Sequence, residues 1–300
     1  MRSKDHKYID ALLPNEMAVK AEEIGARKAA MNTSALFVLA VLAGAFIAFG
    51  AALATTVSTS GDTAMAFGVN RLLTGFVFSL GLILVVVGGA ELFTGNNLIV
   101  MAWANGRVTT FQIIRDWAIV YVGNFVGAFG ISVLMFLAGS HALGKSAVGM
   151  TALSIANSKS GLGFGQAVAL GVLCNVLVCL AVWMSYSGRT AIDKVVAVVP
   201  PVTAFVALGF EHSIANMYFI PSGLLIKSLA PESFWTQIGR TPADFPSITM
   251  SNFFWGNLLP VTIGNIIGGA VLVGIVYWFV YLRGRPKVDL TGRSNVEETS

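Results

Sequence analysis

Six long stretches of this sequence are almost free of charged side chains, and this feature constrains the fold more than any other. They are residues 34–57, 72–106, 117–144, 160–188, 195–226 and 245–282. The second and the fifth hold one glutamate each, and the other four hold no Lys, Arg, Asp or Glu. A helix needs about 20 apolar residues to cross a bilayer, and only 11% of the chain is charged. The sequence therefore predicts an all-α polytopic membrane protein with six transmembrane helices.

The basic residues are distributed unevenly around these stretches. With the N-terminus placed in the cytoplasm, the inner segments hold 14 Lys and Arg residues and the outer loops hold 5. Cytoplasmic segments of membrane proteins carry such an excess. The pattern predicts a multi-pass protein of the bacterial inner (cytoplasmic) membrane, in contact with lipid, with both termini cytoplasmic and no nucleic acid partner. The first apolar run follows a charged segment and is too long for a cleavable signal peptide.

Three regions follow from this pattern. Residues 1–33 form a cytoplasmic segment in which Pro14 opens an amphipathic helix. This helix lies at the membrane surface or against the pore mouth, or else the segment only orients the chain. Residues 34–283 form the six-span transmembrane channel domain, and residues 284–300 form a polar cytoplasmic tail.

An internal repeat relates two halves of the membrane domain, residues 34–144 and 160–283. Residues around the glutamate of the second span recur in the fifth at an offset of 120, and a Gly-Asn motif of the third span recurs in the sixth. Each half holds three spans, an odd number, so the two halves enter the membrane from opposite sides in an inverted 3+3 repeat. The matched residues are Gly89, Glu91 and Asn96 with Gly209, Glu211 and Asn216, and Gly123, Asn124 and Gly127 with Gly264, Asn265 and Gly268.

The second and fifth spans are too long for one continuous helix each. Roughly 33 helical residues would measure about 50 Å at 1.5 Å per residue, against a hydrocarbon core of about 30 Å. Both carry a polar, glycine-bearing segment in the middle. We therefore expect both helices to be broken there, which in several folds marks a transport site.

Three ionisable residues fall in the middle of the expected spans: Glu91, Glu211 and His212. Such groups are costly in the bilayer, so each is a candidate for function. Glu91 and Glu211 hold equivalent positions of the repeat. We expect them to support the helix breaks by accepting hydrogen bonds from freed backbone amides; a proton relay is the alternative.

His212 breaks the symmetry of the repeat, because the first half has Leu92 in that position. An imidazole exchanges protons near neutral pH, which favours a functional role over that of a satisfied core residue. Thr94 is equally asymmetric, since its counterpart is Ile214. A Thr94 hydroxyl that faces the ring would fix its tautomer.

The spans lack the residues of a strong ion pore. An anion pore carries Arg or Lys, and a cation channel carries rings of carboxylates or carbonyls. One titratable histidine, half-helix N-termini that favour anions and many Leu and Phe side chains suit a weak acid instead. The anion enters a vestibule, takes a proton at the centre and crosses apolar constrictions as the neutral acid.

Enzyme chemistry is not indicated. No metal cluster, nucleophile elbow or phosphate loop falls at the middle of the spans, so the sequence predicts no enzyme and no cofactor. The two cysteines, Cys174 and Cys179, point in different directions on a helix. They imply neither a disulfide nor a metal site.

Four motifs resemble those of the formate/nitrite transporter family, and the resemblance covers nearly the whole chain. It implies an aquaporin-like fold with broken second and fifth helices, and a homopentamer with one pore per protomer. It also implies bidirectional passage of formate and related small monovalent anions, with proton-coupled uptake at low pH. The motifs are residues 91–96, 179–189, 209–217 and 261–269.

The resemblance also assigns roles to individual residues. It implies a central pair, a constriction on the cytoplasmic side, a second constriction, a polar lining and an outer lysine in a vestibule. Thr94 and His212 form the implied central pair. Phe78, Leu82 and Phe205 form the implied cytoplasmic-side constriction, and Leu92 belongs to the second one. Asn175 and Asn265 are the implied polar lining, and Lys159 is the implied outer lysine of the vestibule.

Other transport functions stay open on the sequence alone. A nitrite or hydrosulfide channel of the same family fits the residues, and selectivity among formate, acetate, lactate and nitrite is not determined. A water or glycerol channel would share the fold. Its Asn-Pro-Ala pair is missing, because Asn96 is followed by Asn97 and Asn216 by Met217.

Overall fold

The computed structural model describes residues 11–59 and 65–284, and this part of the chain is helical apart from turns and short connections. The predicted all-helical class is confirmed. Residues 285–300, nearly all of the expected tail, lie outside the described residues. The α-helices are α1 (Pro14–Ala29), α2 (Thr33–Ser58), α3 (Phe67–Gly88), α4 (Phe93–Asn96), α5 (Val100–Ala104), α6 (Thr110–Leu137), α7 (Ala147–Ser160), α8 (Phe164–Ser187), α9 (Ala191–Ala207), α10 (Ser213–Leu229), α11 (Glu232–Ile238), α12 (Leu259–Ile266) and α13 (Val276–Tyr281).

Five helical segments of the described chain are long and apolar enough to cross a membrane by length and composition. They are α2, α3, α6, α8 and the last helix, Asn252–Tyr281. In that last helix, π-helical turns at Asn252–Leu258 and Ile267–Ile275 alternate with α12 and α13. The expected fifth span is instead divided between α9 and α10, of 17 residues each.

Both long segments are interrupted where the sequence predicts. Helix α3 is followed by Gly89, which has a φ of 77°, and α4 begins at Phe93. Helix α9 is followed by Gly209, with a φ of 76°, and α10 begins at Ser213. Glycine adopts this left-handed conformation without steric cost and commonly ends a helix. Each break therefore rests on a glycine that the repeat places at the same position.

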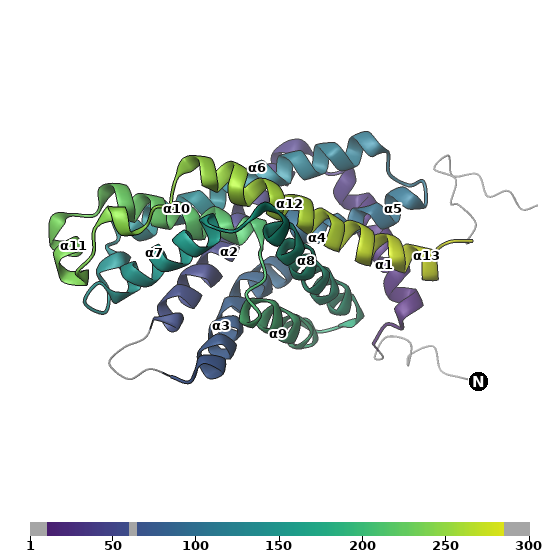
Figure 1. Ribbon diagram of the computed structural model, residues 1–300. Helices are drawn as coiled ribbons and strands as arrows, with labels where there is room; N and C mark the ends of the chain where they lie inside the picture. The colour runs from purple at the N-terminus through teal and green to yellow at the C-terminus, as the bar shows by residue number, and fades with distance from the viewer. Residues whose placement is uncertain (1–10, 60–64, 285–300) are drawn as a thin grey trace, which may run out of the picture.

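The molecule has α7, α10 and α11 at one end and α1, α5 and α13 at the other (Figure 1). Helix α2 packs against α3 and α6, α8 packs against α9 and α12, and α3 packs against α9. A Cβ on Gly127 or Gly268 would overlap a backbone carbonyl of the facing helix. Small residues thus allow close backbone contact between α2 and α6 and between α8 and the last helix.

Helix α1 begins at Pro14, as the sequence predicts, and has Pro at its first turn. Its buried side includes Met17, Ala18 and Ala21, and it packs against α5, the short helix Asn97–Ile99 and α8. The helix therefore docks on the end of the bundle, where its last turn reaches the first break.

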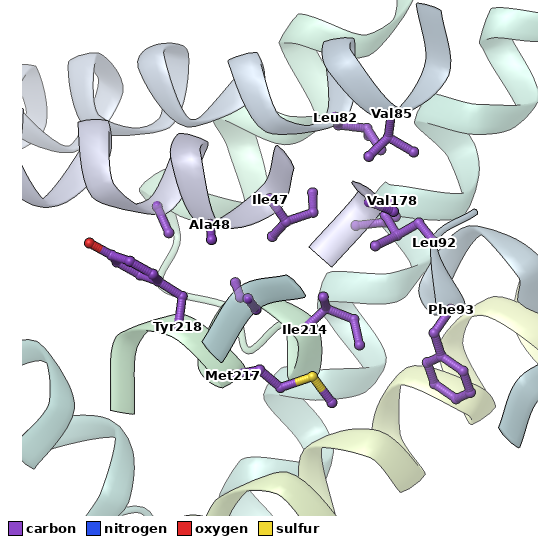
Figure 2. Close-up of a cluster of buried hydrophobic side chains, with 14 of the residues drawn as sticks. Ile47, Ala48, Leu82, Val85, Leu92, Phe93, Val178, Ile214, Met217 and Tyr218 are labelled. Atoms are coloured by element: carbon purple, nitrogen blue, oxygen red, sulfur yellow. The ribbon is translucent and has the colours of Figure 1, made fainter. Parts of the chain in front are cut away.

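The largest group of buried apolar side chains fills the space between the two breaks. Figure 2 shows Tyr218 and Phe93 at opposite ends of this cluster, with Ile47 and Ile214 between them. Ile214 is completely buried. An apolar layer therefore separates the two ends of the protein at the depth of the breaks.

Candidate functional site

The two helix breaks bring Thr94 and His212 together. The Oγ1 atom of Thr94 lies 3.0 Å from Nε2 of His212, and both side chains are buried. The imidazole ring also stacks on Phe205, with ring centroids 6.0 Å apart. A hydroxyl and an imidazole thus meet in a buried, mainly apolar layer, at the point where both segments leave helical geometry.

The backbone of α10 determines which nitrogen of His212 carries a proton. The amide of Ala215 donates to Nδ1 at 3.0 Å, so the ring caps the N-terminus of α10. An N–H group can only donate, hence Nδ1 is the acceptor and the neutral ring carries its proton on Nε2. That proton points at the Thr94 hydroxyl. The tautomer is therefore set mainly by the helix cap, and Thr94 sets the direction of the Nε2–H.

Asparagine side chains hold the backbone of both breaks in the same way. At the first break, Asn124 accepts from the amide of Phe93 at 2.9 Å and donates to the carbonyls of Ala40 and Glu91. Asn124 is fully buried. The bonds to Phe93 and Glu91 satisfy backbone groups that the interrupted helix leaves without partners, and the bond to Ala40 ties the break to α2.

At the second break, Asn265 accepts from the amide of Ser213 at 3.0 Å and donates to the carbonyls of Gly171 and Glu211. Asn175 is also fully buried and donates to the carbonyls of Thr94 and Asn265. In the structure both side chains brace the backbone, and the expected pore lining by Asn175 and Asn265 stays a prediction.

The two glutamates form ion pairs with lysines from neighbouring helices. Nζ of Lys28 lies 2.8 Å from Oε2 of Glu91, and Nζ of Lys159 lies 2.7 Å from Oε1 of Glu211. Freed backbone amides were the expected partners of these carboxylates. In the structure these amides donate to asparagine side chains, so the partners of the carboxylates differ from those expected, and the support of the breaks by the two glutamates stays a prediction.

Behind each ion pair lies a second pair of polar side chains. Asn96 donates to both Glu91 and Asp116, at 2.9 Å each. Asn216 donates to Glu211 at 2.6 Å and to Asn257 at 2.7 Å. We call the first set, Lys28, Glu91, Asn96 and Asp116, the inner cluster, and the second set, Lys159, Glu211, Asn216 and Asn257, the outer cluster.

Sequence reasoning missed four of these residues: Lys28, Asn124, Asp116 and Asn257. The repeated Gly-Asn motif contained the signal for Asn124. Lys28 precedes the second-span glutamate by 63 residues, whereas Lys159 precedes its glutamate by 52, so the constant offset of the repeat does not find it.

A large cavity opens at the end of the molecule that carries α7. Its volume is about 530 Å³, and its lining includes Lys159, His212, Phe78 and Phe205. Arg71 also lines it and donates to the carbonyls of residues 206 and 207 at the end of α9. Two cations and several hydroxyl groups make this cavity favourable for a small anion.

The smaller cavity, of about 170 Å³, lies under α1. Its lining includes Lys28 and Glu91 of the inner cluster together with Leu82 and Leu92. Lysine is thus present at both cavities, and each lysine is neutralised by a glutamate at the helix break.

The four expected constriction residues divide between the cavities. Phe78 and Phe205 line the larger cavity, with ring centroids 5.7 Å apart. Leu82 and Leu92 line the smaller one. The expected grouping of Leu82 with the two phenylalanines is corrected accordingly. Phe78 and Phe205 lie on the α7 side of the apolar layer. The family resemblance predicts them on the cytoplasmic side, which is the side of α1.

Two opposed cavities, broken helices and a polar pair in the apolar layer between them define a membrane protein of the channel or transporter class. The chain belongs to the formate/nitrite transporter family, whose model matches residues 15–279.

Individual relatives cover almost the same part of the chain. The formate channel FocA of Escherichia coli (strain K12) is 50% identical over 274 residues, which cover 91% of this chain and 96% of that relative. The formate channel FocA of Haemophilus influenzae is 42% identical over 276 residues, covering 92% and 97%. A solved structure described as a pentameric formate channel with formate bound has a TM-score of 0.79 and 44% identity, covering 84% of this chain and 98% of that one.

Proposed function

We propose that the protein is a bidirectional channel for formate and related small monovalent anions, with proton-coupled uptake at low pH. The observation that carries this proposal is the buried Thr94–His212 pair between two lysine-bearing cavities. The relatives named as formate channels support the choice of substrate. They also favour this function over a water or glycerol channel and over catalysis.

Proton coupling places a requirement on the His212 ring. Formate accepts a proton on a carboxylate oxygen and becomes formic acid, and a cationic ring that gives up its Nε2 proton becomes neutral with its remaining proton on Nδ1. The ring must then lose that proton and regain one on Nε2 before Nδ1 can again accept from the Ala215 amide. The cationic ring has a proton on Nδ1 as well, so it cannot accept the Ala215 amide. Protonation of the ring therefore breaks the hydrogen bond that caps α10. Neutral His212 acts toward the anion as a hydrogen-bond donor from Nε2.

The proposed architecture is an inverted 3+3 repeat of six spans with both termini in the cytoplasm. The corresponding contacts at the two breaks support it, because Asn124 and Asn265 brace them alike. In this orientation α1 and the smaller cavity face the cytoplasm. The larger cavity, with Lys159 and the Phe78–Phe205 pair, faces outward as a vestibule.

We further propose a homopentamer in lipid with one pore per protomer, by analogy with the pentameric channel that this chain resembles. Each protomer holds its own Thr94–His212 pair, so the centre of the ring carries no substrate. Mass measurement in mild detergent is expected to give five chains. A monomer with full flux would remove the pentamer from the proposal.

Anion currents of the purified protein in planar bilayers test the function. The substrate series is formate, acetate, lactate, nitrite and hydrosulfide, each over a pH range. Formate is expected to carry the largest current. A larger nitrite or hydrosulfide current would assign the protein to another substrate of the family, and permeation by glycerol without anion current would overturn the proposal.

A further inference from the structure

We propose that Asp116 is a proton-binding site that sets the charge of the inner cluster and so controls the entry of anions from the α1 side. This inference rests on the proposed function. The structure supplies two observations for it: an unpartnered buried oxygen, and a direct comparison with the outer cluster.

Asp116 lies on α6 and is completely buried. Its Oδ1 accepts the 2.9 Å hydrogen bond from Asn96. Its Oδ2 is also buried, and no donor of the described chain reaches it. An ionised carboxylate buried in this way has one oxygen without a hydrogen bond, which is unfavourable.

In the outer cluster, Asn257 takes the place that Asp116 has in the inner cluster. There Asn257 uses its Oδ1 to accept from Asn216, as Asp116 does from Asn96. Its Nδ2 then donates to the carbonyl of Lys159 at 2.9 Å and to Oε2 of Glu211 at 3.3 Å. An aspartate has the shape of asparagine but can donate only when Oδ2 carries a proton. Protonated Asp116 is therefore the chemical equivalent of Asn257.

The charges around Asp116 in the described chain are those of Lys28 from α1, Glu91 from the helix break and Arg115 on α6 itself. The Arg115 guanidinium bonds to the carbonyl of Met31 and the hydroxyl of Thr33. Lys28 and Glu91 neutralise each other in their ion pair. Ionised Asp116 thus leaves the inner cluster with one negative charge, and protonated Asp116 leaves it neutral.

This charge acts on the smaller cavity, because Lys28, Glu91 and Asn96 all line it. An ionised Asp116 opposes the attraction of Lys28 for an anion, and a proton on Asp116 removes that opposition. Acid on the α1 side is therefore expected to favour entry of formate from that side. The charge lining of a cleft changes entry rates by about 10-fold to 1,000-fold, and a single charge is expected to act at the lower end of this range, about tenfold.

The test uses the full-length protein in planar bilayers and exchanges the two residues. The variants are Asp116→Asn, which makes the inner cluster like the outer one, and Asn257→Asp, which does the reverse. The pH is lowered on one side at a time, and formate current from that side is measured. Infrared difference spectra record the carbonyl band of a protonated carboxyl group.

In the unmodified protein, acid on the α1 side is expected to raise entry from that side by about tenfold beyond the response to acid on the other side. Asp116→Asn removes this excess and the carbonyl band, and Asn257→Asp creates an excess on the opposite side. The proposal is overturned when Asp116→Asn keeps the excess and the band, or when the unmodified protein shows neither. The infrared band and the Asp116→Asn variant decide the matter even when Asn257→Asp does not assemble.

A protein that carries no formate at any pH contradicts the proposed function. The carbonyl band still decides in that case whether Asp116 binds a proton.

Discussion

The two helix breaks share their support and differ at their centre. At each break, one asparagine side chain accepts a hydrogen bond from a backbone amide and donates hydrogen bonds to two backbone carbonyls. Yet Leu92 stands where His212 stands, and Thr94 stands where Ile214 stands. The comparison teaches that the asparagine bracing is the same with and without the reactive side chains, and that His212 adds an N-cap to α10 at the second break alone. The bracing gives both breaks the same shape, and two unmatched positions supply the chemistry.

The largest expected effect comes from removing the titratable ring at the second break. His212→Asn is expected to abolish acid-driven formate uptake. Asparagine is a good N-cap residue, so α10 keeps a partner for the Ala215 amide and the protein is expected to fold. Uptake into proteoliposomes under a pH gradient measures the effect, with oligomer mass as the control. Unchanged pH dependence in this variant would remove His212 from the mechanism.

The second prediction tests whether Asn124 and Asn265 stabilise the two breaks equally. Asn124→Ala and Asn265→Ala each leave buried backbone groups without partners, at a cost of about 1–3 kcal/mol per group in the free energy of unfolding. We expect similar losses of thermal stability in both variants. Flux is expected to fall further in Asn265→Ala, because Ser213 directly follows His212. Very different stabilities would show that the two breaks are not supported alike.

A smaller effect separates the hydroxyl of Thr94 from its shape. Thr94→Ser keeps the partner of His212 Nε2, whereas Thr94→Val keeps the volume and loses the hydrogen bond. One such bond contributes about 0.5–1.5 kcal/mol, and more when a buried group is left unsatisfied. The serine variant is therefore expected to conduct and the valine variant largely to fail. Equal formate currents in the two variants would mean that Thr94 does not orient the ring.

The smallest effect concerns the end of the molecule that carries α7 and α11 instead of the breaks. His141 follows α6 and stacks on Phe136 at 4.8 Å between ring centroids, with its Nδ1 buried and unpartnered in the described structure. Burial lowers the pKa of His141. The unfolded chain therefore binds this proton at higher pH than the folded chain, and folded stability falls as the pH drops below about 6.5.

Thermal unfolding at neutral and mildly acidic pH checks this prediction. His141→Phe keeps an aromatic ring against Phe136 and removes the titratable group. The variant is expected to lose less stability on acidification than the unmodified protein. An identical loss in both proteins would assign the acid sensitivity to other residues.

The breaks could be predicted from the sequence because their causes are local. Gly89 and Gly209 end their helices through a backbone conformation that glycine favours, and the glutamates mark the depth. The meeting of Thr94 with His212 followed from the symmetry of the repeat together with the family resemblance. Both are properties that nearby residues and a constant offset reveal.

The partners of the glutamates could not be predicted because they depend on how α1 and α7 dock. Lys28 lies in a segment whose amphipathic pattern fits a membrane surface equally well, and only its packing on α5 and α8 brings it to Glu91. The bracing contacts of Asn175 and Asn265 could not be predicted, because a buried amide that braces a backbone and one that lines a pore have the same sequence pattern. Phe78 and Leu82 are one helical turn apart, yet Phe78 lines the larger cavity and Leu82 lines the smaller one, on the other side of the apolar layer.

The two cavities leave only a short apolar layer between the Phe78–Phe205 pair and the Leu82–Leu92 pair. When both cavities hold electrolyte, nearly all of the membrane voltage falls across this layer. A formate anion that crosses it then experiences almost the full potential, about 2.3 kcal/mol per 100 mV for one charge. A formic acid molecule that crosses the same layer experiences none. A voltage-dependent flux therefore indicates that formate crosses the layer as the anion. A voltage-independent flux indicates that formate is protonated before it crosses.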